Sequence, residues 1–92
     1  MKPRILVVED DKNIIFNISL ILLTNDYEPI VAKNGQEALE LLSKLDLPPD
    51  LILSNTKMPK MDGYTLYQNI TRNPKYNHIP FIFVLQNLPQ MI

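Results

Sequence analysis

One stretch of this chain, residues 49–63, constrains its fold more than any other. It holds the unbroken apolar run 51–53, which follows a proline pair and precedes a polar loop. A short apolar run between turn signals is typical of a strand buried on both faces of a parallel sheet. Ligands of open α/β sheets bind outside the carboxyl ends of such strands. We therefore expect any chemistry of this protein to lie close to Asn55, just after the run.

The rest of the chain alternates short apolar runs with segments of helical periodicity. Runs that predict strands occupy residues 5–8, 30–32, 51–53 and 81–85, and segments that predict helices occupy about 12–25, 34–45 and 64–72. Alternation of this kind favours a parallel sheet with helices on both faces, joined by right-handed crossovers. We therefore predict an α/β fold built on an open parallel sheet.

The first helical segment is apolar on nearly every side. One face carries Ile14, Ile15, Ile18, Ile21 and Leu22, and a second stripe carries Phe16, Leu20 and Leu23. A helix with apolar residues almost all round is normally buried on more than one side, which is what we predict here. In the segment 64–72, the spacing predicts that Leu66, Tyr67 and Ile70 face inward.

Length and composition exclude several classes of protein. A chain of 92 residues predicts a single domain, and a net charge of −1 with a pI near 5.7 offers no basic field to nucleic acid. The chain has no cysteine for disulfides or thiolate metal sites. Its apolar runs fall short of the ~20 residues of a membrane span, and the run before Glu9 is too short for a secretory signal. We expect one cytoplasmic domain over residues 1–92, bound to neither nucleic acid nor membrane.

Three motifs then coincide in order along the chain. Glu9-Asp10-Asp11 ends the first strand, Asn34-Gly35 opens the second helix, and residues 49–63 span the third strand and its loop. Together these motifs resemble the receiver domain of two-component response regulators, up to about residue 85. The resemblance implies a flavodoxin-like fold with strand order 2-1-3-4-5. The sequence stops before the last strand and helices of that fold, so we expect order 2-1-3-4 in a domain truncated after its fourth strand.

The resemblance also implies roles for residues at the carboxyl ends of the strands. In receivers an acidic pair binds Mg²⁺, and here that pair is Glu9 and Asp10. The backbone carbonyl that completes the metal site falls on Lys57. The aspartate that accepts a phosphoryl group from a histidine kinase is replaced by Asn55, and the Thr or Ser that reads the phosphoryl group is replaced by Leu85. The family's lysine on the fifth strand has no counterpart.

These departures predict that the usual phosphoryl transfer fails. An amide has no anionic oxygen to attack phosphorus, and a leucine side chain cannot donate a hydrogen bond. Loss of one carboxylate at position 55 also predicts a weak Mg²⁺ site, to which the Asn55 oxygen still contributes a ligand. In one interpretation the Lys57 side chain folds into the site in place of the cation; in the simpler one it stays in solvent.

The function we expect is a receiver-like interaction module in two-component phosphorelay signalling, without catalytic residues or enzymatic activity. Its partner would be a histidine kinase or another signalling protein. One alternative is an active phosphoacceptor whose natural sequence has aspartate at position 55, and another is a truncated fragment without function. A nucleotide-binding protein is disfavoured because Glu9-Asp10-Asp11-Lys12, not a glycine-rich phosphate loop, follows the first strand.

Two apolar surfaces predict that the chain associates with itself. Without a fifth strand, the uncharged run 81–85 becomes a sheet edge, and edges of this kind recruit other strands. The stripe of Phe16, Leu20 and Leu23 lies where solvent-facing polar residues are expected. We therefore expect a homo-oligomer through the fourth strand or through this stripe, and a two-fold interface could cover both.

Overall fold

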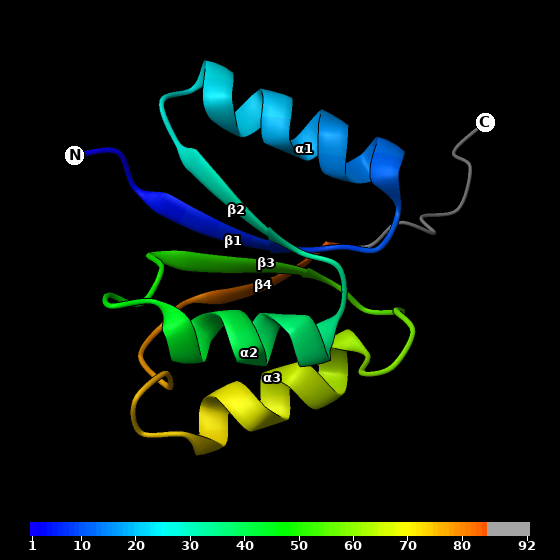
Figure 1. Ribbon diagram of the computed structural model, residues 1–92, viewed down its shortest axis with the longest axis vertical. Coiled ribbons are helices and arrows are strands. Elements are labelled where there is room, and N and C mark those ends of the chain that lie inside the picture. Colours follow the sequence, from blue (N-terminus) through cyan, green and yellow to red (C-terminus); the bar gives the residue numbers. More distant parts are fainter. Residues whose placement is uncertain (85–92) are drawn as a thin grey trace.

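The chain forms one parallel sheet with helices on both faces (Figure 1), in a computed structural model that describes residues 1–84. The elements follow the order β1 (Arg4–Val8), α1 (Lys12–Thr24), β2 (Glu28–Ala32), α2 (Gly35–Lys44), β3 (Leu51–Asn55), α3 (Gly63–Arg72) and β4 (Phe81–Val84). The strands lie in the order β2-β1-β3-β4, and every neighbouring pair is parallel. The predicted α/β class and strand order are confirmed.

The third strand is longer than its apolar run predicts. Ser54 and Asn55, expected in a loop, belong to β3 and pair with Phe83 and Val84 of β4. Ser54 has ladder partners on both β1 and β4, and Asn55 has one on β4. This pairing outweighs the weak intrinsic preference of both residues for strands. Leu85, predicted to end the fourth strand, lies outside the described residues.

The main core lies between the sheet and the α2–α3 layer. Leu6 and Ile52 are fully buried at its centre, where Leu42 of α2 and Leu66 of α3 cover them. The predicted inward position of Tyr67 is wrong, because this residue remains 41 % exposed. The buried residues of α3 are Gly63, Leu66 and Ile70, and Tyr67 lies at the rim of this inner face against the ring of Phe81.

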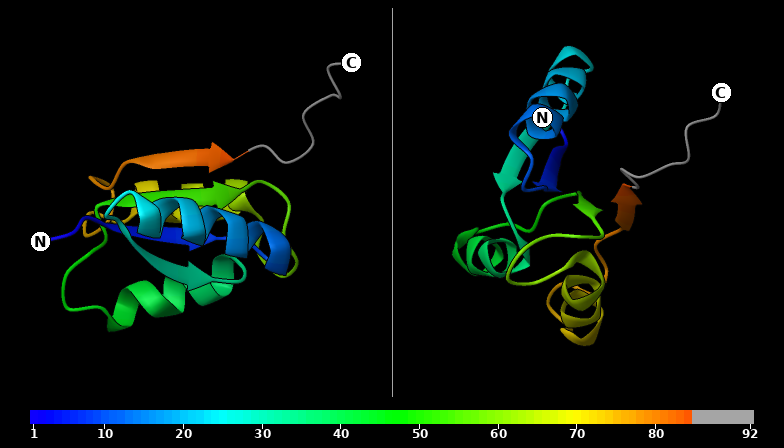
Figure 2. Two further views of the ribbon diagram at one scale, coloured as in Figure 1. Left: turned by 90° about the horizontal axis from the view of Figure 1, so that it is seen from above. Right: turned by 90° about the vertical axis from the view of Figure 1, so that its right-hand side faces the viewer.

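Helix α1 covers the other face of the sheet, and it does so poorly. It stands apart from α2 and α3 (Figure 2), and none of its residues is buried. Phe16 is 65 % exposed, and Leu20 and Leu23 are exposed beside it. The prediction that this helix is buried on more than one side is therefore wrong, because within residues 1–84 no second layer packs on it. In the same part of the chain, no helix is long and apolar enough to cross a bilayer.

Candidate functional site

The four residues proposed for the site gather at the carboxyl ends of β1 and β3. Val8 of β1 lies opposite Ser54 of β3, so Glu9 and Asn55, each one residue further on, are neighbours on adjacent strands. Strands in a sheet lie about 4.8 Å apart. Glu9 is 1 % and Asn55 is 4 % exposed, whereas Asp10 faces solvent. The sheet thus places Glu9 and Asn55 next to one another at its edge, and Asp10 follows Glu9 in the chain on the solvent side.

The Asn55 side chain is folded onto the backbone of its own loop. Its Nδ2 donates a hydrogen bond of 2.6 Å to the carbonyl oxygen of Lys57, and its Oδ1 accepts a longer one of 3.4 Å from the Lys57 N–H. The Asn55 amide therefore hydrogen-bonds to the carbonyl oxygen of Lys57, which the receiver resemblance assigns as a metal ligand. The Lys57 side chain is exposed, so the interpretation in which it replaces the cation is wrong.

The neighbouring polar groups are held in place by backbone hydrogen bonds. The Glu9 carboxylate accepts the N–H of Asp11 at 3.0 Å, and the Glu9 N–H donates to the carbonyl of Ala32 on β2 at 2.9 Å. Ser54 is fully buried, and its Oγ donates to the backbone oxygen of Asn55 at 2.9 Å. No buried side-chain nitrogen or oxygen in residues 1–84 lacks a hydrogen-bond partner. The site is thus internally satisfied as it stands.

Both helices of the core layer are tied to the loop that follows Asn55. The Gly63 N–H at the start of α3 donates to Thr56 O at 2.9 Å, and the Gly35 N–H at the start of α2 donates to Met61 O at 3.1 Å. Gly63 approaches β3 so closely that an added Cβ would collide with the backbone oxygen of Asn55. We did not predict this role for Gly63 from the sequence, because the Asp-Gly pair signals only a turn.

Asp62 fixes the start of α3, and the hydrogen bonds that it accepts there perturb its pKa. Its Oδ1 accepts the Thr65 backbone N–H at 2.8 Å. That bond, followed by one from the Thr65 hydroxyl, lowers the pKa of Asp62 below its ordinary value of 3.8. A carboxyl group with a lowered pKa stabilises the fold above its unfolded-state pKa. This contribution is lost as the pH falls through the folded-state pKa, so the cap persists at neutral pH.

The oxygen atoms at this end of the sheet are of the type that a hard divalent cation prefers, but only two of the groups are negatively charged. The Glu9 and Asp10 carboxylates, Asn55 Oδ1 and Lys57 O are the ligand types that Mg²⁺ accepts. In the described part of the chain, no cluster of three or more His, Cys, Asp or Glu residues could hold a metal. A cation must also displace the Asn55 Nδ2–H from Lys57 O. The residues therefore fit Mg²⁺ in the type of their oxygen ligands, and a low affinity remains a prediction.

We expect about 10 mM Mg²⁺ to raise the Tm slightly and Asp10→Ala to abolish the rise. A dissociation constant near that concentration corresponds to about 0.4 kcal/mol of stabilisation. For a domain of this size that is roughly 2–3 °C. Thermal unfolding with and without Mg²⁺ measures it. Asp46→Ala, which removes the same charge from an exposed loop at the other end of the sheet, is the control, and an equal Mg²⁺ effect in both variants would refute the site.

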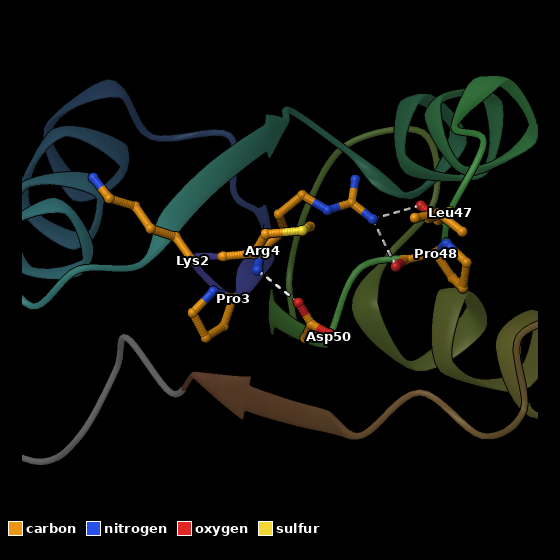
Figure 3. A pocket seen from close by; sticks show the side chains of 7 residues that line it. Lys2, Pro3, Arg4, Leu47, Pro48 and Asp50 are labelled. Carbon is orange, nitrogen blue, oxygen red and sulfur yellow. Dashed lines mark hydrogen bonds between the residues drawn. The ribbon is translucent and has the colours of Figure 1, made fainter.

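A concavity lies at the opposite end of the sheet from Asn55 (Figure 3). It has a volume of about 400 Å³ and is lined by residues 1–4 and by Leu47, Pro48 and Asp50. The Arg4 guanidinium donates to the carbonyls of Leu47 and Pro48 at 2.7 and 2.8 Å, and the Arg4 N–H donates to Asp50 at 2.8 Å. Arg4 thus fastens the loop before β3 to the start of β1, a structural role away from Asn55.

Comparison with known proteins places this arrangement in a family. Residues 5–89 match the response regulator receiver domain. The sensor histidine kinase TmoS of Ectopseudomonas mendocina is 40 % identical over 88 residues, which are 96 % of this chain and 9 % of that protein. The response regulator PleD of Caulobacter vibrioides is 36 % identical over 84 residues, which are 91 % of this chain and 18 % of PleD. The chain thus spans less than a fifth of either relative.

Solved structures agree with this assignment. The receiver domain of a signal transduction histidine kinase from Syntrophus aciditrophicus superposes with a TM-score of 0.85 at 36 % identity, covering 89 % of this chain and 61 % of that one. The phosphorylated cyanobacterial phytochrome response regulator RcpA superposes with a TM-score of 0.87 at 28 % identity, covering 96 % and 68 %. The fold, the site at the strand ends and these matches agree: the chain belongs to the family of response regulator receiver domains.

Proposed function

We propose that this receiver domain accepts no phosphoryl group at position 55 and acts by binding other signalling proteins. One observation carries the proposal: the family's phosphoacceptor position holds Asn55, whose Nδ2 donates to Lys57 O at 2.6 Å. A carboxamide lacks the anionic oxygen that attacks phosphorus. Its hydrogen bond also turns the amide nitrogen into the loop and ties up a backbone oxygen of the site.

The weak cation site reinforces this proposal. Mg²⁺ bound at such a site supplies positive charge that neutralises a transferring phosphoryl group. Glu9, Asp10 and Lys57 O would hold it, with the Asn55 oxygen as a neutral fourth group. With Asn55 at this position, the site therefore offers the metal one negative charge fewer than it would with an aspartate. Phosphoryl transfer is thus opposed twice, at the nucleophile and at the metal.

The proposed partners follow from the family. Receiver domains work together with histidine kinases and other signalling proteins, and the relatives TmoS and PleD are named as a sensor histidine kinase and a response regulator. We propose a partner of this class and no enzymatic activity for the chain itself. We also predicted that Leu85 cannot hydrogen-bond to a phosphoryl group as the family's Thr or Ser does. That stays a prediction, because Leu85 lies outside the described part of the chain.

A second candidate function requires only one different residue. If the natural sequence carries aspartate at position 55, the same sheet and the same Glu9 and Asp10 would support an active phosphoacceptor. The codon in the parent gene decides between these two. A truncated fragment without function remains the third possibility, which a detectable partner or self-association would contradict.

A beryllofluoride titration with Mg²⁺, followed by NMR, tests the proposal. Beryllofluoride mimics a phosphoryl group only when an aspartate oxygen binds it, so we expect no saturable shifts around Asn55. Asn55→Asp is the matched positive control, because it supplies that oxygen at the same backbone position. Saturable shifts at residues 55–57 of the unaltered chain would overturn the proposal.

A further inference from the structure

Asn34 and Gly35 form a pair that reacts within itself wherever the chain is free to move. In such a pair the glycine backbone nitrogen attacks the side-chain carbonyl carbon of the asparagine, because glycine has no side chain to hinder the approach. Gly35 is the only glycine that follows an asparagine in this sequence. The pair lies outside the candidate cation site, so the proposed function gives it no role.

In the folded chain, the Asn34 side chain is held by the first turn of α2. Asn34 is the N-cap of this helix and is 8 % exposed, and its Oδ1 accepts the Glu37 N–H at 2.8 Å. Its backbone oxygen accepts the Ala38 N–H at 3.0 Å. These bonds fix the rotamer of the side chain, as an N-cap does. The Asn34 amide therefore cannot turn towards the Gly35 nitrogen unless the cap breaks.

The Gly35 nitrogen is held by the loop that follows β3. Its N–H donates to Met61 O at 3.1 Å, and Figure 1 shows this loop, residues 56–62, beside the start of α2. A Cβ added to Gly35 would lie 2.7 Å from Met61 Cγ, so the Met61 side chain also packs closely here. The nitrogen must lose its proton to attack, and a hydrogen-bonded, covered N–H loses it slowly. Loop 56–62 thus protects the second reactive atom of the pair.

The same loop is fastened to the candidate functional site. Asn55 Nδ2 donates to Lys57 O at 2.6 Å, and Asn55 Oδ1 accepts the Lys57 N–H at 3.4 Å. Met61 follows in the same loop, so its position beside Gly35 depends on how the chain leaves Asn55. The reactive pair is therefore coupled to the candidate site through the backbone of one loop.

We propose that Asn34 is a deamidation site that reacts only when loop 56–62 opens. The Gly35 nitrogen then loses its proton to a base in solution and bonds to Asn34 Cγ, and Asn34 Nδ2 leaves as ammonia. The product is a cyclic succinimide that contains the Gly35 nitrogen. Water opens this ring at either carbonyl, which gives aspartate at position 34 or isoaspartate, whose main chain runs through the side chain. Water is the only co-reactant.

The two products affect α2 differently. Aspartate keeps an oxygen that caps the Glu37 N–H and adds a negative charge, which the amino end of a helix favours. Isoaspartate lengthens the main chain and displaces the Gly35 N–H from Met61 O, so loop 56–62 loses its hydrogen bond to α2. Formation of isoaspartate therefore changes the contact between α2 and the loop permanently.

The rate of deamidation follows the population of the open loop. Local opening has its own free energy, which is smaller than that of global unfolding. When opening and closing are faster than the chemistry, the rate is proportional to the open fraction. A ligand that binds the closed loop therefore slows deamidation, and one that opens the loop accelerates it. This inference holds whether or not position 55 accepts a phosphoryl group.

Peptide mapping of the folded and the guanidinium-denatured chain, both incubated in warm, mildly alkaline buffer, tests the protection. We expect Asn34 to react at least about tenfold more slowly in the folded chain. Asn69 and Asn77, which precede isoleucine and histidine, are internal controls that should stay intact in both samples over the same period. Equal rates for Asn34 in the two samples, or no reaction in the denatured one, would overturn the inference.

Asn55→Ala tests the role of the loop. It removes both hydrogen bonds to Lys57, and we expect it to accelerate deamidation of Asn34 at least about threefold. Ile5→Ala is the control, because it creates a cavity in β1 at the other end of the sheet and lowers the global stability. No acceleration in Asn55→Ala, or an equal or larger one in Ile5→Ala, would contradict the role of the loop. The comparison of the folded and denatured unaltered chain stands even if a variant does not fold.

Discussion

Gly63→Ala lowers the Tm by roughly 10–20 °C, the largest effect we expect from any single methyl group in this chain. The new Cβ would collide with the backbone oxygen of Asn55 and lie 3.1 Å from Thr56 Cα. Both obstacles are main-chain atoms at a strand end, which cannot rotate away. Overpacking of this kind costs about 2–3 kcal/mol. Thermal unfolding by circular dichroism measures the loss.

Gln68→Ala is the matched control, since it adds alanine to an exposed position of the same helix. Alanine is a better helix former than glutamine, so this variant should keep the Tm of the unaltered chain or raise it slightly. A Gly63→Ala Tm within the error of the control would show that α3 does not rest on the end of β3. It would also contradict our explanation that α3 and the loop after β3 hold Asn55 in position.

Asn55→Asp should make the fold less stable without a cation and far more responsive to Mg²⁺. The substitution removes the Nδ2–H bond to Lys57 O and places a carboxylate beside the buried Glu9. It also adds a charged ligand, which we expect to tighten Mg²⁺ binding about tenfold. At about 10 mM Mg²⁺ that gain adds about 1 kcal/mol of stabilisation. Thermal unfolding should then show a Mg²⁺-dependent rise about 4–8 °C larger than in the unaltered chain.

Asn77→Asp adds the same charge in the exposed loop before β4, at the other end of the sheet, and should leave the Mg²⁺ response unchanged. We also expect beryllofluoride shifts in Asn55→Asp to stay near position 55, because Leu85 cannot hydrogen-bond to a phosphoryl group. A full rearrangement of the domain in this single variant would contradict our view of the read-out. A Mg²⁺ response no larger than that of Asn77→Asp would contradict our view of the metal site.

The sequence predicts the fold well where alternation and turn signals agree. The strand order and helix placement follow from the runs beginning at Ile5 and Leu51 and from the receiver motifs. The burial of α1 is not predictable in this way. Apolar periodicity shows which faces of a helix are apolar, but it does not show whether another element packs against each of them. Phe16 is apolar for reasons that only a partner, or the rest of a longer protein, would explain.

The sequence also predicts which residues gather at the site but not how they interact. Glu9 and Asn55 meet because parallel strands bring their carboxyl ends to one edge. The hydrogen bond from Asn55 to Lys57 O depends on a side-chain rotamer and on the path of the loop, which no spacing rule determines. The same holds for the close approach of Gly63, a distance between main-chain atoms that are eight residues apart in sequence.

Incubation with acetyl phosphate and Mg²⁺, followed by intact-mass measurement, tests the central claim most directly. We predict that the unaltered chain gains no phosphoryl group, while Asn55→Asp gains one that is labile, as an acyl phosphate is. Peptide mapping would locate any adduct. A phosphoryl group on residues 55–57 of the unaltered chain, formed to the same extent as in Asn55→Asp, would contradict the claim that Asn55 ends phosphoryl transfer in this domain.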